Sequence, residues 1–135
     1  MKSSCSYIDY QETNMFSKLI SDYLEKKEFI QSFYACPTDL NGLSQAIAAR
    51  KNFHTDRLLI QRVFSDAYTS VDASPAQLEN IAALGNENAF TICTAHQPNI
   101  FTGYLYFIYK TAHVIALSQQ FSQSFPDKKF IPVFY

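Results

Sequence analysis

The stretch AFTICTAHQPNIFTGYLYFIYK, residues 89–110, decides the fold of this chain. Its first part, residues 89–94, is short, apolar and bounded by polar residues, which predicts a strand buried on both faces of a sheet. The polar run at 96–99 cannot extend such a strand, and the sequence after it favours a helix over about residues 103–123. A strand followed by a loop and a helix N-terminus is the arrangement that binds anionic groups in α/β folds.

A second strand is expected at residues 130–135, which read FIPVFY. Strand, helix and strand in this order normally form a right-handed parallel crossover. Pro132 has no N–H for the ladder, so it is expected near the start of its strand or at a sheet edge. Because a parallel sheet needs cover on both faces, two strands are not enough. We therefore expect an α/β fold whose core is incomplete, in a chain that is the N-terminal part of a longer protein.

Residues 1–87 are predicted to form an N-terminal helical segment, and residues 88–135 the start of the α/β domain. Five short helices are expected at about 15–25, 29–34, 39–50, from 55 onward, and from 75 to 84. The predicted N-terminal caps include Thr13 or Asn14, Thr55 and Ser74. Gly42 is expected to weaken the third helix by roughly 1 kcal/mol relative to Ala. The first helix is expected to carry a single apolar stripe, and the apolar side of the fourth helix is expected to be buried.

Composition excludes several classes of protein. A net charge of −1 gives no electrostatic attraction for nucleic acid or an anionic membrane, so neither partner is expected. The three cysteines are odd in number and form no CxxC pair, which indicates reduced thiols in a cytoplasmic protein. The N-terminus lacks the apolar core of a signal peptide, and the longest apolar tract, 104–117, is too short and too polar to span a bilayer.

The polar loop is the one place where the sequence indicates chemistry. Because residues 88–126 contain no Asp or Glu, the loop before the second helix of this region is a candidate anion site. His96 could donate to a phosphate or stabilise a developing charge, or it could be a loop histidine bonded to the backbone. Gln97 could bind a ligand or the loop itself. Lys110 could extend along the surface into water, or its charge could lie in the cleft.

The other reactive side chains form no recognisable catalytic or metal-binding pattern in the sequence. Cys93 lies inside the predicted strand and is expected to be an inert, buried thiol. No carboxylate pair, nucleophile triad or cluster of metal ligands is visible, so no metal is predicted. There is no P-loop or GxGxxG pattern, and the chain has only three glycines.

The run TAHQPNIFTGYLYFIYK, residues 94–110, resembles the cysteine ligase family of bacillithiol biosynthesis, the BshC family. That family carries a TGQQ-x-G-L-F-T-G-P-L-Y-T-x-Y-K-like stretch after its first strand, and the last residues, IPVFY, are similar to its VPVFW strand. The matching positions are Thr94, Gln97, Phe101, Thr102, Gly103, Leu105, Tyr106, Tyr109 and Lys110. The departures are Ala95 and His96, where the family often has Gly and Gln, and Asn99 and Tyr104, where it often has Gly and Pro.

The resemblance implies a Rossmann-like core, similar to class I synthetases and nucleotidyltransferases. It also implies a ligase that adds cysteine to glucosaminyl-malate by forming an amide. A carboxylate is a poor acyl donor, so a nucleotide, ATP or ADP, is the implied cofactor. The whole protein would carry a C-terminal coiled coil and form a homodimer. The 135-residue chain alone is expected to be inactive.

On this reading the nucleotide site is formed by the loop between the first strand and the helix. The predicted nucleotide-binding residues are Thr94, His96, Gln97, Thr102 and Gly103, and the predicted catalytic residues are His96 and Lys110. Gly103 would let the backbone approach the ligand, and Thr102 would cap the helix. Two other readings stay open: an α/β module that binds a nucleotide or a partner without catalysis, and a structural fragment in which the loop has no role.

Overall fold

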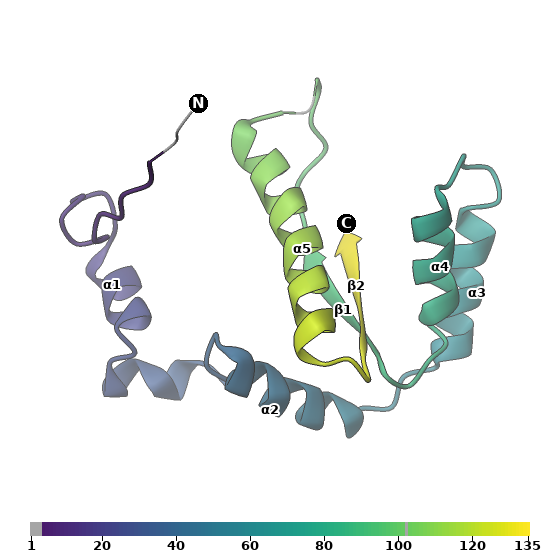
Figure 1. The fold of residues 1–135 in the computed structure, drawn as a ribbon, viewed down its shortest axis with the longest axis horizontal. Helices are drawn as coiled ribbons and strands as arrows, with labels where there is room; N and C mark the ends of the chain where they lie inside the picture. Colours follow the sequence, from purple (N-terminus) through teal and green to yellow (C-terminus); the bar gives the residue numbers. More distant parts are fainter. Residues whose placement is uncertain (1–3, 102) are drawn as a thin grey trace. The chain divides into compact units, whose positions relative to one another are not determined.

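The computed structural model describes residues 4–101 and 103–135. Figure 1 shows the order of the elements along the chain. Contacts divide the chain into two compact units, one ending at Phe53 and the other beginning at His54. The first contains α1 (Lys18–Leu24), a 3₁₀ helix η1 (Glu28–Phe33) and α2 (Leu40–Lys51). The second contains α3 (Arg57–Ala67), α4 (Pro75–Ala83), β1 (Ala89–Thr94), α5 (Leu105–Ser124) and β2 (Lys129–Phe134).

The strand–helix–strand prediction is confirmed. β1 and β2 pair in parallel, from Ala89 opposite Lys129 to Thr94 opposite Phe134, and α5 connects them and lies along them (Figure 1). The bounds of β1 are those predicted, while β2 begins and ends one residue earlier than expected. Pro132 lies opposite Ile92 within the strand, and β2 is an edge strand among the described residues, which is where proline is tolerated.

The expectation that β1 is buried on both faces is wrong. On one face, Phe130 of β2 packs against the rings of Phe121 and Phe125, with centroid distances of 5.6 and 6.0 Å, so the C-terminal half of α5 covers this face. On β1 itself Ala89 is buried, but Thr91 and Cys93 are exposed. Cys93 is therefore not the buried thiol that was expected, because no described element covers its position on the strand.

The small apolar core of the second unit lies where α4 meets the strands. It consists of Leu84, Ala89 and Ile131, with Ala83 and Val133 packed against it. Burial of Ile131, which is 3% exposed, explains why the short parallel pair holds its place beside α4.

Polar contacts fix α3 and α4 to the base of the strands. The Arg57 guanidinium donates to the carbonyls of Ala89 and Glu87, at 3.0 and 3.3 Å. The Lys129 ammonium lies 2.7 Å from the Glu79 carboxylate, and its hydrogen bond and charge lower the pKa of that carboxyl. Contacts therefore group α3 and α4 with the strands, although secondary structure changes from helix to strand at residue 88 as predicted. The domain boundary at 87/88 stays a prediction.

Two helix starts in this unit show what the sequence could and could not indicate. Ser74 caps α4 as predicted, in a reciprocal capping box with Gln77, and Pro75 is the first helical residue. Thr55 was the wrong cap for α3, because the Asp56 carboxylate accepts from the Leu59 N–H at 3.0 Å. An ionised acceptor at a helix N-terminus is the stronger of two adjacent candidates.

The first unit departs more from expectation. Helix α1 begins at Lys18 with Ser17 at its cap, because Asn14 adopts a positive φ of 53° in a turn and cannot start the helix. Asp39 caps α2 by accepting from the Gly42 N–H at 2.9 Å, which together with Lys26 lowers the pKa of its carboxyl. Gly42 is buried, and a Cβ there would collide with the backbone carbonyl of Pro37. Gly42 therefore allows the start of α2 to pack closely against the backbone at Pro37.

The apolar stripes of α1 and α3 are not buried among the described residues. Leu19 on α1 is 68% exposed and Val63 on α3 is 55% exposed, and α3 has no buried residue at all. Apolar patches of this kind mark surfaces that other protein segments cover. Both stripes were recognised correctly, but the expectation that the apolar side of the fourth helix, α3, is buried is wrong for the described residues.

Candidate functional site

The loop after β1 is held at its start by the end of β2. The Tyr135 N–H donates to the Thr94 carbonyl at 3.1 Å, and the His96 N–H donates to the Tyr135 carbonyl at 3.2 Å. These bonds continue the parallel ladder past both strands. The backbone of His96 is therefore fixed at the carboxyl end of the sheet, which is where ligands bind in open α/β folds.

The His96 ring is half-buried and surrounded by groups from the loop and α5. Its Nδ1 lies 2.7 Å from the Gln97 carbonyl oxygen and 2.8 Å from the Asn99 carboxamide. Its Nε2 is hydrogen-bonded to the Tyr106 hydroxyl. The rings of Tyr106 and Phe107 pack against it, with centroid distances of 5.0 and 5.8 Å. Both ring nitrogens are thus hydrogen-bonded within the protein. The bond to the Gln97 carbonyl matches the second of the two alternatives for His96, a loop histidine bonded to the backbone.

Lys110 fixes the residue before His96. Its ammonium donates to the Ala95 carbonyl at 2.5 Å, and the side chain is half-buried. It therefore does not extend along the surface into water, which was one of the two readings of the sequence. Tyr106 and Lys110 are four residues apart on α5 and so lie on one helix face, which contacts two successive loop residues.

The second half of the loop is a tight turn before α5. Gly103 has a φ of 61°, and its N–H donates to the Ile100 carbonyl at 3.1 Å. Tyr104 is the N-cap of α5 and makes no side-chain capping bond. The predicted cap, Thr102, lies outside the described residues, and the cap position belongs to Tyr104.

Of the predicted site residues, the structure brings together Thr94, His96 and Lys110, while the Gln97 side chain is exposed and Gly103 lies against Asn99, a neighbour of the His96 ring. Sequence reasoning missed Tyr106 and Asn99 as partners of the His96 ring. The spacing of Tyr106 and Lys110 was the available signal, because it places both on the helix face that follows the loop.

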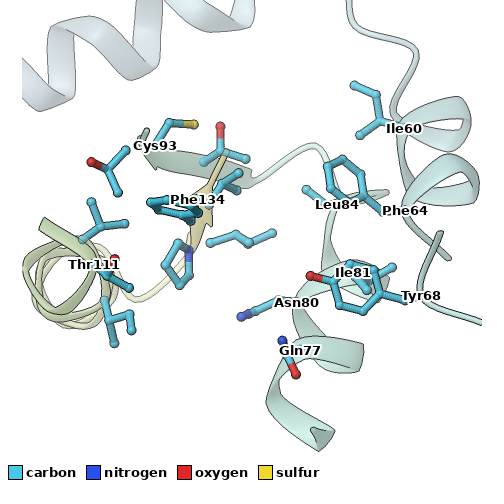
Figure 2. A pocket seen from close by; sticks show the side chains of 17 residues that line it. Ile60, Phe64, Tyr68, Gln77, Asn80, Ile81, Leu84, Cys93, Thr111 and Phe134 are labelled. Atoms are coloured by element: carbon cyan, nitrogen blue, oxygen red, sulfur yellow. The ribbon is translucent and has the colours of Figure 1, made fainter. Parts of the chain in front are cut away.

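A separate hollow of about 510 Å³ is lined by residues of both strands and of α3, α4 and α5. Figure 2 shows side chains from α3 and α4 on one side of it and from the strands and α5 on the other. The lining is mainly apolar, including Ile60, Phe64 and Ile81, with Cys93 at the strand.

The part of the chain that the structure describes holds no group of three or more residues that could bind a metal ion. Nor does any helix in this part have the length and apolar character needed to cross a membrane.

Lys110→Met is expected to loosen the loop. The substitution keeps the length of the side chain and removes a charge-assisted bond to the Ala95 carbonyl, a kind of bond worth about 1.5–3 kcal/mol. Hydrogen exchange at the His96 amide should then accelerate roughly tenfold. Lys128→Met is the control, because that lysine pairs with Asp127 away from the loop. Equal exchange rates in the two variants would show that Lys110 does not hold the loop.

A sequence model of the family described as "Bacillithiol biosynthesis BshC, N-terminal Rossmann-like domain" matches residues 3–135. The chain belongs to the BshC family. Its fold class is that of the Rossmann-like domain at the N-terminus of BshC proteins, as the family resemblance implied, and the strand–helix–strand order agrees with it.

Curated BshC relatives match along the whole chain. A protein of Christiangramia forsetii is 36% identical over 137 residues, which cover 100% of this chain and 25% of the relative. A protein of Flavobacterium johnsoniae is 35% identical, with 100% and 26% covered, and one of Bacillus cereus is 26% identical, with 87% and 22% covered. All three carry the name "Putative cysteine ligase BshC". The chain thus spans about a quarter of the length of these relatives, and no solved structure matches it.

Proposed function

We propose that this chain is the N-terminal part of a ligase that joins the carboxyl group of cysteine to the amine of glucosaminyl-malate in bacillithiol biosynthesis. Its support is the match of residues 3–135 to the N-terminal domain of a bacillithiol biosynthesis family, together with the name of the relatives. The whole protein would be a cytoplasmic homodimer, with a coiled coil in the part that follows these residues.

We place the nucleotide, ATP or ADP, at the loop between β1 and α5. One observation carries this proposal: the loop is fixed at the carboxyl end of the parallel pair and leads into the uncapped N-terminus of a 20-residue helix. First-turn amides and the helix dipole favour an anion there, and residues 88–126 contain no acidic side chain to compete. When bound, the nucleotide would activate the cysteine carboxylate as an acyl donor.

We assign the loop residues three roles: nucleotide contact, contact with the substrate amine, and positioning of the loop. Thr94, Gln97, Thr102 and Gly103 would contact the nucleotide, with Gly103 allowing close approach of the backbone. His96 would act on the substrate amine, because the structure engages both of its nitrogens with neutral groups and leaves no N–H free for a phosphate. Lys110 would act by holding the loop in place through the Ala95 carbonyl.

The double variant His96→Ala/Gln97→Ala tests the nucleotide site. In the full-length protein we expect the Kd for ATP, measured by isothermal titration calorimetry, to rise roughly two- to tenfold, because Gln97 would lose a hydrogen bond to the nucleotide worth about 0.5–1.5 kcal/mol, while His96 contributes to the amine and not to ATP. Formation of the cysteine amide should fall as well. The matched control is His113→Ala/Gln119→Ala, which changes the same residue types at exposed positions of α5. Unchanged affinity and unchanged product formation would remove the loop from the site.

The exposed apolar stripe of α3 favours a second candidate, a module that binds a partner protein without catalysis. The same experiment separates the two. A full-length protein that binds ATP but forms no amide from cysteine and glucosaminyl-malate would be a binding module.

A further inference from the structure

The contacts of His96 determine which of its ring nitrogens carries the proton. A backbone carbonyl only accepts hydrogen bonds, so the nitrogen 2.7 Å from the Gln97 oxygen, Nδ1, must donate. The Asn99 amide nitrogen, Nδ2, lies 2.8 Å from the same His96 nitrogen, and two donors cannot face each other, so this assignment requires a half-turn of the Asn99 amide that brings its oxygen there as a second acceptor. In the neutral ring Nε2 then carries the lone pair and accepts from the Tyr106 hydroxyl.

The orientation of the ring is fixed as firmly as its tautomer. The backbone of His96 is tied to the end of β2, and the ring of Phe107 packs edge-on against the imidazole at an interplanar angle of 82°. Phe107 in turn packs edge-on against Phe134 of β2, with a centroid distance of 5.2 Å. The imidazole therefore packs against a ring of α5 that is itself held in place by β2.

We infer that Tyr106 is a positioning residue, whose hydroxyl holds His96 as the Nδ1–H tautomer with the Nε2 lone pair directed away from the loop backbone. The tyrosine is 49% exposed, so a ligand N–H can take the place of its hydroxyl at Nε2. The ligand that suits a lone-pair acceptor is a hydrogen-bond donor, and an uncharged amine has both the donor and the nucleophilic nitrogen. This inference rests on the proposed function, since it assigns His96 to the amine substrate and not to the nucleotide.

Tyr106→Phe tests this role, because it keeps the ring and removes only the hydroxyl. In the full-length protein labelled with 15N-histidine, solid-state NMR reports the tautomer of each ring, and His96→Gln identifies the His96 signal. We expect the ratio of Nδ1–H to Nε2–H forms to fall about fivefold without ligand, the equivalent of one neutral hydrogen bond. The kcat/KM for the sugar amine should fall by a similar factor, while the Kd for ATP stays unchanged.

The matched control is Tyr104→Phe, since Tyr104 stacks on Tyr106 at a centroid distance of 6.0 Å and its ring is 73% exposed. It should leave the tautomer ratio as in the wild type. An unchanged ratio in Tyr106→Phe, or an equal change in Tyr104→Phe, would overturn the inference. A shifted ratio in a protein that neither binds ATP nor forms the amide would instead refute the proposed function and leave the role of Tyr106 standing.

Discussion

Residues 1–135 produced alone are expected to be almost inactive. We expect the rate of cysteine amide formation to be at least roughly 1000-fold below that of the full-length protein. Proximity and orientation of reactants supply a large part of enzymatic rate enhancement, and a partial site cannot provide them. The chain spans about a quarter of its relatives, and the described residues contain one pair of parallel strands. The measurement is mass-spectrometric detection of the amide from cysteine, glucosaminyl-malate and ATP.

The structure gives a physical reason for this loss. One face of β1 is open at Thr91 and Cys93. The hollow beside it is lined mainly by apolar side chains from α3, α4, α5 and the two strands. Parallel sheets normally have both faces covered, so the 135-residue chain alone would leave this apolar surface in water and would lack the groups that complete the site. The full-length protein assayed in parallel is the positive control. Turnover by the 135-residue chain alone would contradict the prediction.

The part of the fold that sequence predicted is the part set by local patterns. The bounds of β1 followed from a six-residue apolar run between polar residues, and the start of α4 followed from Ser74 and Pro75. Both signals act within a few residues and do not depend on what lies across the fold. The helix caps at Thr13 or Asn14 failed because these residues belong to a turn before the helix, in which the Asn14 N–H donates to the Gln11 carbonyl and Asn14 has a positive φ.

Burial could not be read from the sequence in the same way. The stripe on α3 has the spacing of a core helix, yet Leu59 and Val63 are 44% and 55% exposed. Spacing shows which face is apolar, but only the presence of a covering element decides whether that face is buried. Cys93 illustrates the same limit, since an apolar strand was taken to imply an inert thiol.

The candidate site was predicted in its location and not in its contacts. The loop at 94–103 does lie at the carboxyl end of the parallel pair, as the order of strand, loop and helix required. The bond between His96 and Tyr106 joins residues ten positions apart, and its formation depends on how the loop turns at Gly103. No periodicity in the sequence encodes that turn.

Gly103→Ala is expected to weaken ATP binding by the full-length protein roughly 30-fold. Gly103 has a φ of 61°, and an L-residue in this left-handed region costs about 1–2 kcal/mol. A Cβ would also lie only 2.8 Å from Asn99 Cβ and Nδ2, so that side chain would have to leave its place beside the His96 ring. A combined cost of about 2 kcal/mol corresponds to this factor in Kd. Calorimetric titration with ATP measures it.

Gly85→Ala provides the control because it is the same substitution without backbone strain. A Cβ at Gly85 would approach the end of the Gln61 side chain at 2.8 Å, and a flexible side chain can move away. ATP affinity should then stay within about twofold of the wild type, a change of under 0.5 kcal/mol. Equal affinities of the two variants would show that the left-handed turn at Gly103 does not shape the nucleotide site. A loss confined to Gly103→Ala would place the nucleotide against this turn, because the two glycines differ in φ and in what their Cβ atoms would meet.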